Sequence, residues 1–286
     1  MLLKTLREHF YSSLKGDYPE TEIQSFFNLL ADCFLKMKRV EVSLNLYAPI
    51  SGKKIQKFNN AITRLKNQEP IQYIIGSTEF YGLPFKVTES TLIPRPETEE
   101  LVQWAVKISS SKPENLSILD IGTGTGCIAI SLAKNTPYAT VRAVDISKKA
   151  LTVAKTNAKL NKVDVEFMEL DILNWNLEFE NIEFDIIVSN PPYVRNLEKS
   201  QMSENVLRHE PDLALYVENE DPLIFYKSIV EFAKAHLKNN GQLLFEINQY
   251  LGNEMIQLLE DSDFNEIELK KDIFGNDRMI SGTWRS

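Results

Sequence analysis

Cysteine and histidine are scarce in this chain of 286 residues. The two cysteines, Cys33 and Cys127, lie far apart and form no Cys-x-x-Cys pair, and His9, His209 and His236 have no spacing typical of metal ligands. This pattern favours neither a disulfide framework nor a zinc site. The sequence therefore predicts a protein without a metal centre, in a reducing compartment.

Long apolar runs are also missing. No stretch approaches the roughly 18 apolar residues that a membrane span needs, and the N-terminal residues mix charge with apolar residues too soon for a signal peptide. With 43% hydrophobic and 25% charged residues, the composition is that of a soluble globular protein large enough to bury a core. We expect no membrane segment and a cytoplasmic location.

The net charge of −8 is unevenly distributed. Residues 1–85 carry 11 Lys and Arg against 8 Asp and Glu, a charge of +3, which leaves −11 for the rest of the chain. Tight binding to a phosphate backbone needs a positive footprint. The acidic larger part therefore argues against stable nucleic-acid binding, although a solvated surface without a partner explains both charges as well.

The chain is expected to form two domains joined by a hairpin. Residues 1–75 contain stretches such as IQSFFNLLADCFLKM, whose apolar residues recur at helical spacing, and predict a small all-helical domain. Residues 76–93 change to Tyr, Phe and Val separated by Gly and Pro, which is typical of a hairpin linker. Residues 94–286 alternate between strand and helix patterns and form the second predicted domain.

The second predicted domain has the pattern of an α/β fold with a mostly parallel sheet. Short apolar runs separated by helices are typical of parallel strands that are covered on both faces. The last part of the chain has the pattern of two strands joined by a turn at Gly275 and Asn276, so the sheet should end in an antiparallel hairpin. The five strands expected before this hairpin are 117–122, 140–145, 165–171, 184–190 and 241–247.

A glycine-rich turn follows the first of these strands and opens a helix. Glycines let the backbone approach a ligand closely, and the free N–H groups of a helix start can donate to it. A dinucleotide fingerprint would need glycine at position 127, and a phosphate loop of the Walker type would need Gly-Lys-Ser/Thr; neither is present. The turn contains Asp120, Gly122, Thr123, Gly124, Thr125 and Gly126.

Polar groups also stand at the ends of the next two strands. Asp145 ends the second strand, where a carboxylate can accept both hydroxyls of a ribose, although it could instead cap the helix that starts at Ser147. Asp171 ends the third strand and could accept from an exocyclic amine, and Trp175 offers an apolar wall for a purine or is simply a core residue. Because ligands of open α/β sheets bind at the carboxyl ends of strands, these groups together predict an adenosine site.

The stretch Val188–Val194, VSNPPYV, ends the fourth strand, which usually lies beside the first in doubly wound sheets. Asn190 offers a side-chain carbonyl and Pro191 a main-chain carbonyl with fixed torsions, so the two can accept both hydrogens of one NH₂ group. An amide or adenine nitrogen is a poor nucleophile because its lone pair is delocalised, and two acceptors would orient it and return electron density to it. Tyr193, after Pro192, could stack on a planar substrate.

These motifs resemble those of a known family. GTGTG, Asp145 and NPPY are similar to the motifs of class I S-adenosylmethionine-dependent methyltransferases that modify amino nitrogens. EPIQYIIG, EFYGLPFKV, LIPRPETEELV, HEPDLAL and GNDRMISG resemble the protein glutamine N5 methyltransferases of the PrmC/HemK type, which modify the GGQ glutamine of peptide chain release factors. The resemblance covers nearly the whole chain, most loosely at the N-terminus. EINQYLG departs from the expected Glu-Ile-Gly and places Asn248 at the glycine position.

The resemblance implies a fold, a cofactor and a reaction. The implied fold is a class I (Rossmann-like) methyltransferase domain with a seven-stranded, mostly parallel sheet, and the implied cofactor is S-adenosylmethionine. The implied partners are release factors, so the protein would act in translation termination without a metal. By position, the cofactor residues would be Asp120, Gly122, Thr123, Gly124, Thr125, Gly126, Asp145, Asp171, Trp175 and Asn190. The catalytic residues would be Asn190, Pro191 and Tyr193, which with Pro192 would also bind the substrate.

Other functions fit parts of the sequence less well. An adenine N6 DNA methyltransferase could use NPPY on a flipped base, but the acidic larger domain and the lack of a basic target-reading domain disfavour it. Cys127 disfavours a dinucleotide-binding oxidoreductase, and the intact NPPY motif disfavours a catalytically silent binding module. Cys127 stands at a helix start without an evident base and is expected to be a packing residue. Residues 94–100, PRPETEE, have the composition of a helix start, and the resemblance alone suggests that they border the substrate.

Overall fold

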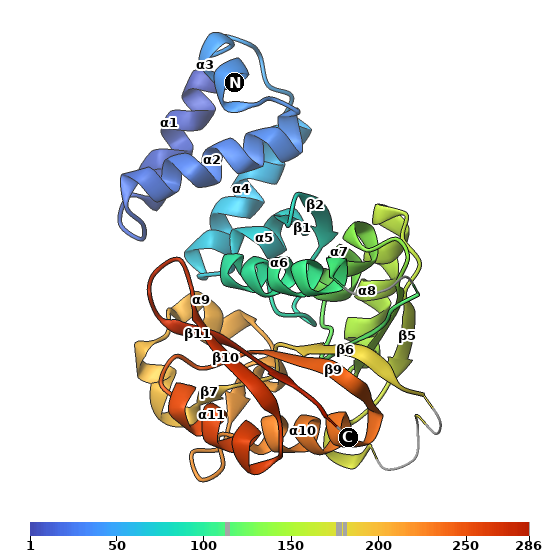
Figure 1. Cartoon of the computed structure of the whole chain (residues 1–286). Coiled ribbons are helices and arrows are strands. Elements are labelled where there is room, and N and C mark those ends of the chain that lie inside the picture. The colour runs from blue at the N-terminus through green and yellow to red at the C-terminus, as the bar shows by residue number, and fades with distance from the viewer. Residues whose placement is uncertain (112–114, 176–178, 180–181, 286) are drawn as a thin grey trace. The chain divides into compact units, whose positions relative to one another are not determined.

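The computed structural model describes residues 1–111, 115–175, 179 and 182–285 (Figure 1). The chain forms two compact units, one of residues 1–76 and 203–209 and the other of residues 77–202 and 210–286. No helix within the described residues is both long and apolar enough to cross a membrane.

The first unit is helical and has its own core. In its first helix the buried residues Leu3, Leu6, Phe10 and Leu14 recur every three or four positions, which places them on one helix face. Phe10 lies edge-on to the ring of Phe27, with 5.5 Å between the ring centroids, inside this core. The helices are α1 (Leu3–Leu14), α2 (Glu20–Leu35), α3 (Arg39–Leu44), α4 (Gly52–Lys66), α5 (Ile71–Ile75) and α9 (Glu204–His209).

The second unit is built on a seven-stranded sheet in the order β10-β11-β9-β6-β3-β4-β5. The pairs from β9 to β5 are parallel, whereas β11 pairs antiparallel with β9 and with β10. The predicted mostly parallel sheet with a terminal hairpin is therefore confirmed. Its strands are β3 (Ser117–Ile121), β4 (Thr140–Asp145), β5 (Glu166–Glu169), β6 (Phe184–Ser189), β9 (Leu237–Glu246), β10 (Asn265–Lys271) and β11 (Asp277–Thr283).

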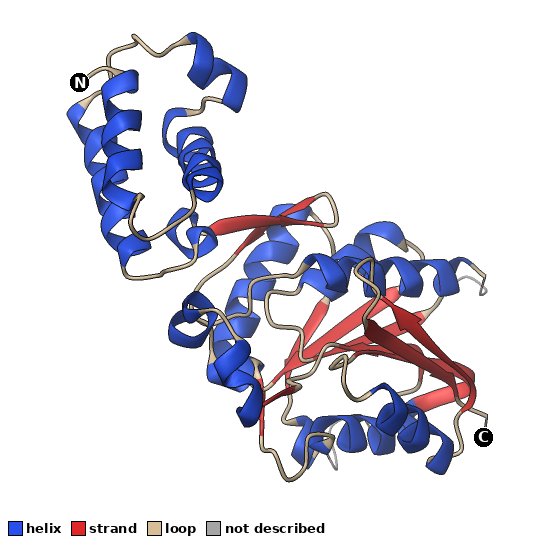
Figure 2. Ribbon diagram, turned by 90° about the vertical axis from the view of Figure 1, so that its left-hand side faces the viewer, coloured by secondary structure: helices blue, strands red, loops and turns tan. Residues whose placement is uncertain are grey.

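Helices cover both faces of this sheet (Figures 1 and 2). Side chains alternate between the faces of a strand, so Ile118 and Ile186 lie in the core with helices α6 and α7, while Leu119 and Ile187 lie in the core with α10 and α11. Both faces are thus apolar, as the continuous hydrophobic strands predict. The helices are α6 (Pro96–Ser110), α7 (Cys127–Asn135), α8 (Lys148–Asn161), α10 (Ile224–His236) and α11 (Gly252–Asp261).

The strand order reverses at β3, and this reversal positions the site. From β3 the chain adds β4 and β5 on one side and then β6 and β9 on the other. Ile121 is paired with Val144 of β4 and with Ser189 of β6, whose Oγ donates to the carbonyl of Ile121 at 2.7 Å. The residues that follow these strands therefore emerge side by side, at the place where open α/β sheets bind ligands.

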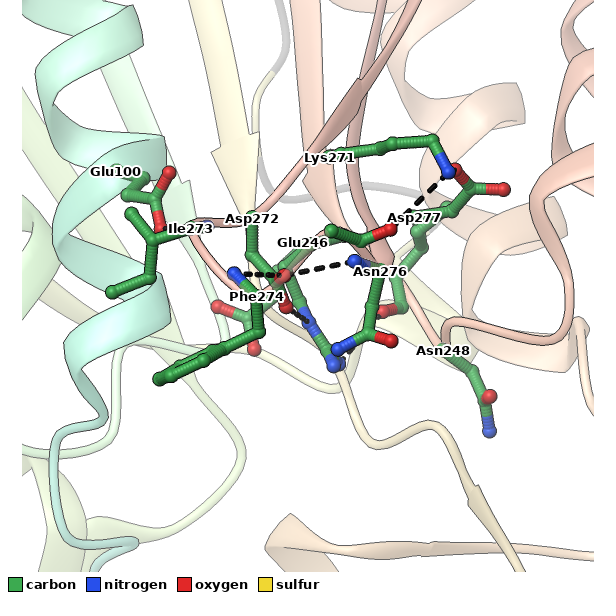
Figure 3. A network of polar contacts seen from close by, with 12 residues as sticks. Glu100, Glu246, Asn248, Lys271, Asp272, Ile273, Phe274, Asn276 and Asp277 are labelled. Atoms are coloured by element: carbon green, nitrogen blue, oxygen red, sulfur yellow. Dashed lines mark hydrogen bonds and ion pairs between the residues drawn. The ribbon is translucent and has the colours of Figure 1, made fainter.

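The structure differs from the sequence prediction in detail. Strand β9 begins at Leu237, four residues before the predicted start, and β5 is shorter than predicted. The β10–β11 connection comprises residues 272–276, and Asp272 Oδ1 accepts from the main-chain nitrogens of Phe274 and Asn276 at 2.9 Å each (Figure 3). The shorter elements are β1 (Ser77–Phe80), β2 (Leu83–Lys86), β7 (Val194–Arg195), β8 (Tyr216–Val217), η1 (Ile172–Asn174), η2 (Asn196–Gln201) and η3 (Asp212–Ala214).

Candidate active site

The glycine-rich turn connects β3 to α7 in a backbone conformation that favours glycine. Gly122, Gly124 and Gly126 have φ values of +76°, +55° and +82°, a region that other L-residues occupy only at a cost. A Cβ added at Gly122 or Gly124 would meet no atom within 4 Å, so the protein leaves space beside these two residues. This open space is what a ligand that approaches the backbone requires.

Gly126 has a different role from the other two glycines. A Cβ there would lie 2.8 Å from Cδ1 of Ile130 and 3.2 Å from Cβ of Ala154. The close approach of α7 to α8 therefore explains by packing why residue 126 is a glycine. That Gly126 also contacts the cofactor stays a prediction.

Asp120 lies at the end of β3 and is completely buried. Its Oδ2 accepts from Thr123 Oγ1 at 2.6 Å and from the main-chain nitrogen of Ala129 at 3.2 Å. Its Oδ1 is buried and, among the described residues, has no hydrogen-bond partner. Burial raises the pKa of Asp120 to about 7. A buried acceptor without a partner, on the residue two positions before Gly122, fits a site that a polar ligand completes.

Asp145 ends β4 and ties the glycine turn to the next helix. Its Oδ2 accepts from the main-chain nitrogen of Gly124 and its Oδ1 from that of Ser147, both at 2.8 Å. Ser147 is itself the N-cap of α8, because its Oγ accepts from the main-chain nitrogen of Ala150. Burial raises the pKa of Asp145, which the two backbone hydrogen bonds oppose. Each carboxylate oxygen has a second lone pair, so the group can still accept from a ligand.

Asp171 and Trp175 flank the short helix η1 after β5. Asp171 caps this helix and accepts from the main-chain nitrogen of Leu173 at 3.0 Å. Trp175 is partly buried and packs edge-on against Phe232, with 5.3 Å between ring centroids. Both side chains thus have structural partners. Trp175 packs against the core, which is one of the two roles that the sequence suggests for it. The predicted contacts of Asp171 and Trp175 with an adenine stay predictions.

Asn190 and Pro191 follow β6. Asn190 Nδ2 donates to Thr98 Oγ1 at 3.3 Å. Within the described residues, no hydrogen bond ends on Asn190 Oδ1 or on the carbonyl oxygen of Pro191. Two neighbouring acceptors are therefore available, as a primary amide with two N–H bonds requires.

Two residues that sequence reasoning did not single out join this site. Glu246, at the end of β9, is 1% exposed; its Oε2 accepts from Thr98 Oγ1 at 2.6 Å and its Oε1 from the Tyr193 hydroxyl at 3.0 Å. Burial raises the pKa of Glu246, which the two hydroxyls and the charge of Arg278 oppose. Thr98 lies in the PRPETEE motif, which the family resemblance suggests as a border of the substrate site. Tyr193 was expected to stack on a substrate, and the structure gives its hydroxyl a carboxylate partner.

Asn248 stands where the family resemblance predicts glycine. Its Nδ2 donates to the main-chain carbonyl of Tyr193 at 3.1 Å and to Glu198 Oε2 at 2.9 Å. Arg278 of β11 donates to the carbonyl of Ile247 at 3.3 Å and to Asp272 Oδ2 at 3.2 Å. Side chains thus tie the NPPY segment to the end of β9 on several sides.

The remaining candidates carry no reactive chemistry here. Burial raises the pKa of the Cys127 thiol to about 12, which makes it a poor nucleophile. In the described part of the chain, no three side chains of His, Cys, Asp or Glu are grouped to hold a metal ion.

Comparisons with known proteins place the whole chain among known families. Two family models match the chain: the methyltransferase small domain over residues 106–213 and the PrmC N-terminal domain over residues 5–76. A release factor glutamine methyltransferase from Flavobacterium psychrophilum is 54% identical over 287 residues, which cover 100% of both chains. One from Bacteroides thetaiotaomicron is 42% identical over 279 residues, which cover 98% of this chain and 99% of that protein.

Among solved structures, the 16S rRNA N2 G1207 methyltransferase of T. thermophilus, in complex with AdoMet and guanosine, resembles this chain with a TM-score of 0.52. It is 20% identical, and the match covers 73% of this chain and 50% of that chain. At this identity the likeness concerns the fold alone. The identity to the curated relatives along the whole chain is decisive: this protein belongs to the release factor glutamine methyltransferase family.

Proposed function

We propose that this protein methylates the side-chain amide nitrogen of a glutamine, that of the GGQ motif in peptide chain release factors, with S-adenosylmethionine as methyl donor. The observation that carries the chemistry is the pair of available acceptors, Asn190 Oδ1 and the Pro191 carbonyl, at the end of β6. The substrate class is supported by the names of relatives that match the chain over its full length.

Features of the glycine turn fit the cofactor. The space beside Gly122 and Gly124 admits a ligand close to the backbone, and the unpartnered Oδ1 of Asp120 offers it a buried acceptor. Asp145 would accept from the ribose hydroxyls, and Trp175 would line the adenine. When bound, S-adenosylmethionine would supply an activated methyl group, which N5 of the glutamine would take from the sulfur while N5 gives up one proton.

The protein's own part in this reaction is orientation. Asn190 Oδ1 and the Pro191 carbonyl would accept the two hydrogens of the amide NH₂ group, which aims the nitrogen and returns electron density to it. This grip should strengthen as the nitrogen gains positive charge, so it favours the transition state over the ground state. A glutamate side chain has no such hydrogens and would leave both acceptors unpaired.

We also propose that the helical unit of residues 1–76 docks the protein substrate, which the match of residues 5–76 to a dedicated N-terminal domain supports. Lys53 and Lys54 are exposed in the first turn of α4 and belong to the basic part of the chain. Replacing both by glutamate should raise KM for a release factor several-fold and leave kcat unchanged. A matched change of Lys155 and Lys159, exposed on α8, should leave both constants unchanged.

The experiment for the proposed function is a methyl-transfer assay with a labelled methyl donor and three acceptors. These are a release factor, the same factor with its GGQ glutamine replaced by glutamate, and duplex DNA. We expect label only in the first. Label in the DNA would favour an adenine N6 methyltransferase, and equal label in both forms of the release factor would exclude the GGQ glutamine as the target.

A further inference from the structure

The hydrogen bonds around Thr98 have a fixed direction. A threonine hydroxyl has one proton to donate. Thr98 Oγ1 lies 2.6 Å from Glu246 Oε2 and 3.3 Å from Asn190 Nδ2. A carboxylate only accepts, so Thr98 gives its proton to Glu246 and can only accept from Asn190. The Asn190 amide must then turn its NH₂ group toward Thr98, which leaves Oδ1 as the atom that faces away.

Glu246 is held firmly enough to impose this direction. It is paired in β9 with Met279 of β11, and the Tyr226 hydroxyl donates to its main-chain carbonyl at 3.0 Å. The Tyr193 hydroxyl donates to the second carboxylate oxygen at 3.0 Å, so each oxygen has a donor. One buried carboxylate thus holds Tyr193 directly and Asn190 through Thr98. Strand β9 also neighbours β6, which delivers Asn190 to the same edge of the sheet.

We propose that Glu246 and Thr98 are positioning residues that lock the Asn190 amide with its oxygen toward the substrate. This inference rests on the proposed function, because it assigns Asn190 Oδ1 to the glutamine NH₂ group. If the amide turned over, its NH₂ group would face that of the substrate, donor against donor. The lock therefore keeps the site in the form that accepts hydrogens, which is the form that selects an amide over a carboxylate.

The test compares Thr98→Val, which keeps the shape but removes the hydroxyl, with Thr98→Ser, which keeps the hydroxyl. Thr136→Val is the matched control, because Thr136 is buried and donates to the carbonyl of Leu132 at 2.7 Å outside the site. For each variant, kcat and KM for a release factor, cofactor affinity and Tm are measured. If Thr98→Val does not fold, Thr98→Ala takes its place, because it removes the hydroxyl without placing a second methyl group beside the Glu246 carboxylate.

We expect Thr98→Val to lower kcat about tenfold or more, as one oriented hydrogen bond is worth, with cofactor affinity within about twofold of wild type. Thr98→Ser should have a kcat within about threefold of wild type. Thr136→Val should have a lower Tm than wild type and an unchanged kcat. A structural role alone would lower Tm in both valine variants and leave both kcat values alike, which would overturn the proposal.

Asn190→Ala in the same assay separates this inference from the proposed function. If Asn190→Ala loses turnover while Thr98→Val keeps it, the lock is wrong and the role of Asn190 stands. If Asn190→Ala keeps normal turnover, the proposed role of Asn190 is wrong, and the lock fails with it. If the wild-type protein does not label the release factor at all, the proposed function itself fails.

Discussion

The three glycines of the β3–α7 turn should respond differently to the same substitution. In Gly126→Ala the backbone of an alanine would have to adopt a φ of +82°, which costs about 1–2 kcal/mol for an L-residue. The new methyl group would also meet Ala154 at 3.2 Å from Cβ and 3.4 Å from Cα, and would displace Ile130 Cδ1, which lies 2.8 Å away; overpacking of this kind costs about 1–3 kcal/mol. The free energy of unfolding should therefore fall by roughly 2–5 kcal/mol.

In Gly122→Ala only the first cost applies. Its φ is +76°, but the added methyl group meets no protein atom within 4 Å. We expect a loss of about 1–2 kcal/mol in stability. The methyl group would instead fill the space proposed for the cofactor, so cofactor affinity should fall about tenfold or more, whereas Gly126→Ala should bind the cofactor nearly normally where it is folded.

Thermal denaturation and calorimetry check both variants. For a unit of this size about 1 kcal/mol corresponds to 2–4 °C in Tm, so Gly126→Ala should lower Tm by roughly 4–20 °C and Gly122→Ala by less. An unchanged Tm in Gly126→Ala would refute the packing argument. Normal cofactor affinity in Gly122→Ala would refute the assignment of the open side of this turn to the cofactor.

Three further predictions concern acidic and amide side chains of the site. Asp145→Ala should weaken cofactor binding by about 1.5–3 kcal/mol, the range for a hydrogen bond to a charged group, and calorimetry that finds unchanged affinity would contradict this. Because the pKa of Asp120 is raised to about 7 by burial, its contribution to stability is full below about pH 4 and is lost as the pH rises through 7. Asp120→Asn has no group that ionises here, so this loss is absent. The Tm of the variant minus that of wild type should therefore rise between pH 4 and 8. A Tm difference that stays constant over this pH range would refute the raised pKa of Asp120. Asn190→Ala should lower kcat by roughly 10² or more with little change in Tm, since the structure shows one 3.3 Å side-chain hydrogen bond to lose, and Asn190→Asp, which keeps an acceptor, should retain some activity.

Much of the fold is visible in the sequence because local patterns determine it. Apolar runs such as that of β6 are bounded by polar residues, and α8 begins at the capping residue Ser147. The early start of β9 at Leu237 escapes this reasoning, since the polar residues before Gly241 resemble a loop. Pairing with neighbouring strands, which local sequence does not encode, extends the strand.

The site is less predictable than the fold, because its contacts join distant parts of the chain. Asn190 and Tyr193 can be recognised in the sequence because they flank the two prolines of NPPY. Thr98 and Glu246 lie 92 and 56 positions from Asn190, and they come into contact with each other and with the motif only after folding. The three glycines look equivalent in the sequence, yet only the structure shows that Ala154 crowds Gly126 and leaves Gly122 open.

The central claim is that a glutamine amide of a release factor receives the methyl group. Its most direct test is mass spectrometry of a release factor after incubation with the protein and S-adenosylmethionine, with peptide fragmentation to locate the change. We expect a mass gain of one methyl group, located on the GGQ glutamine and absent when the enzyme has Asn190→Ala. An unmodified GGQ glutamine, or a methyl group on another residue, would contradict the account.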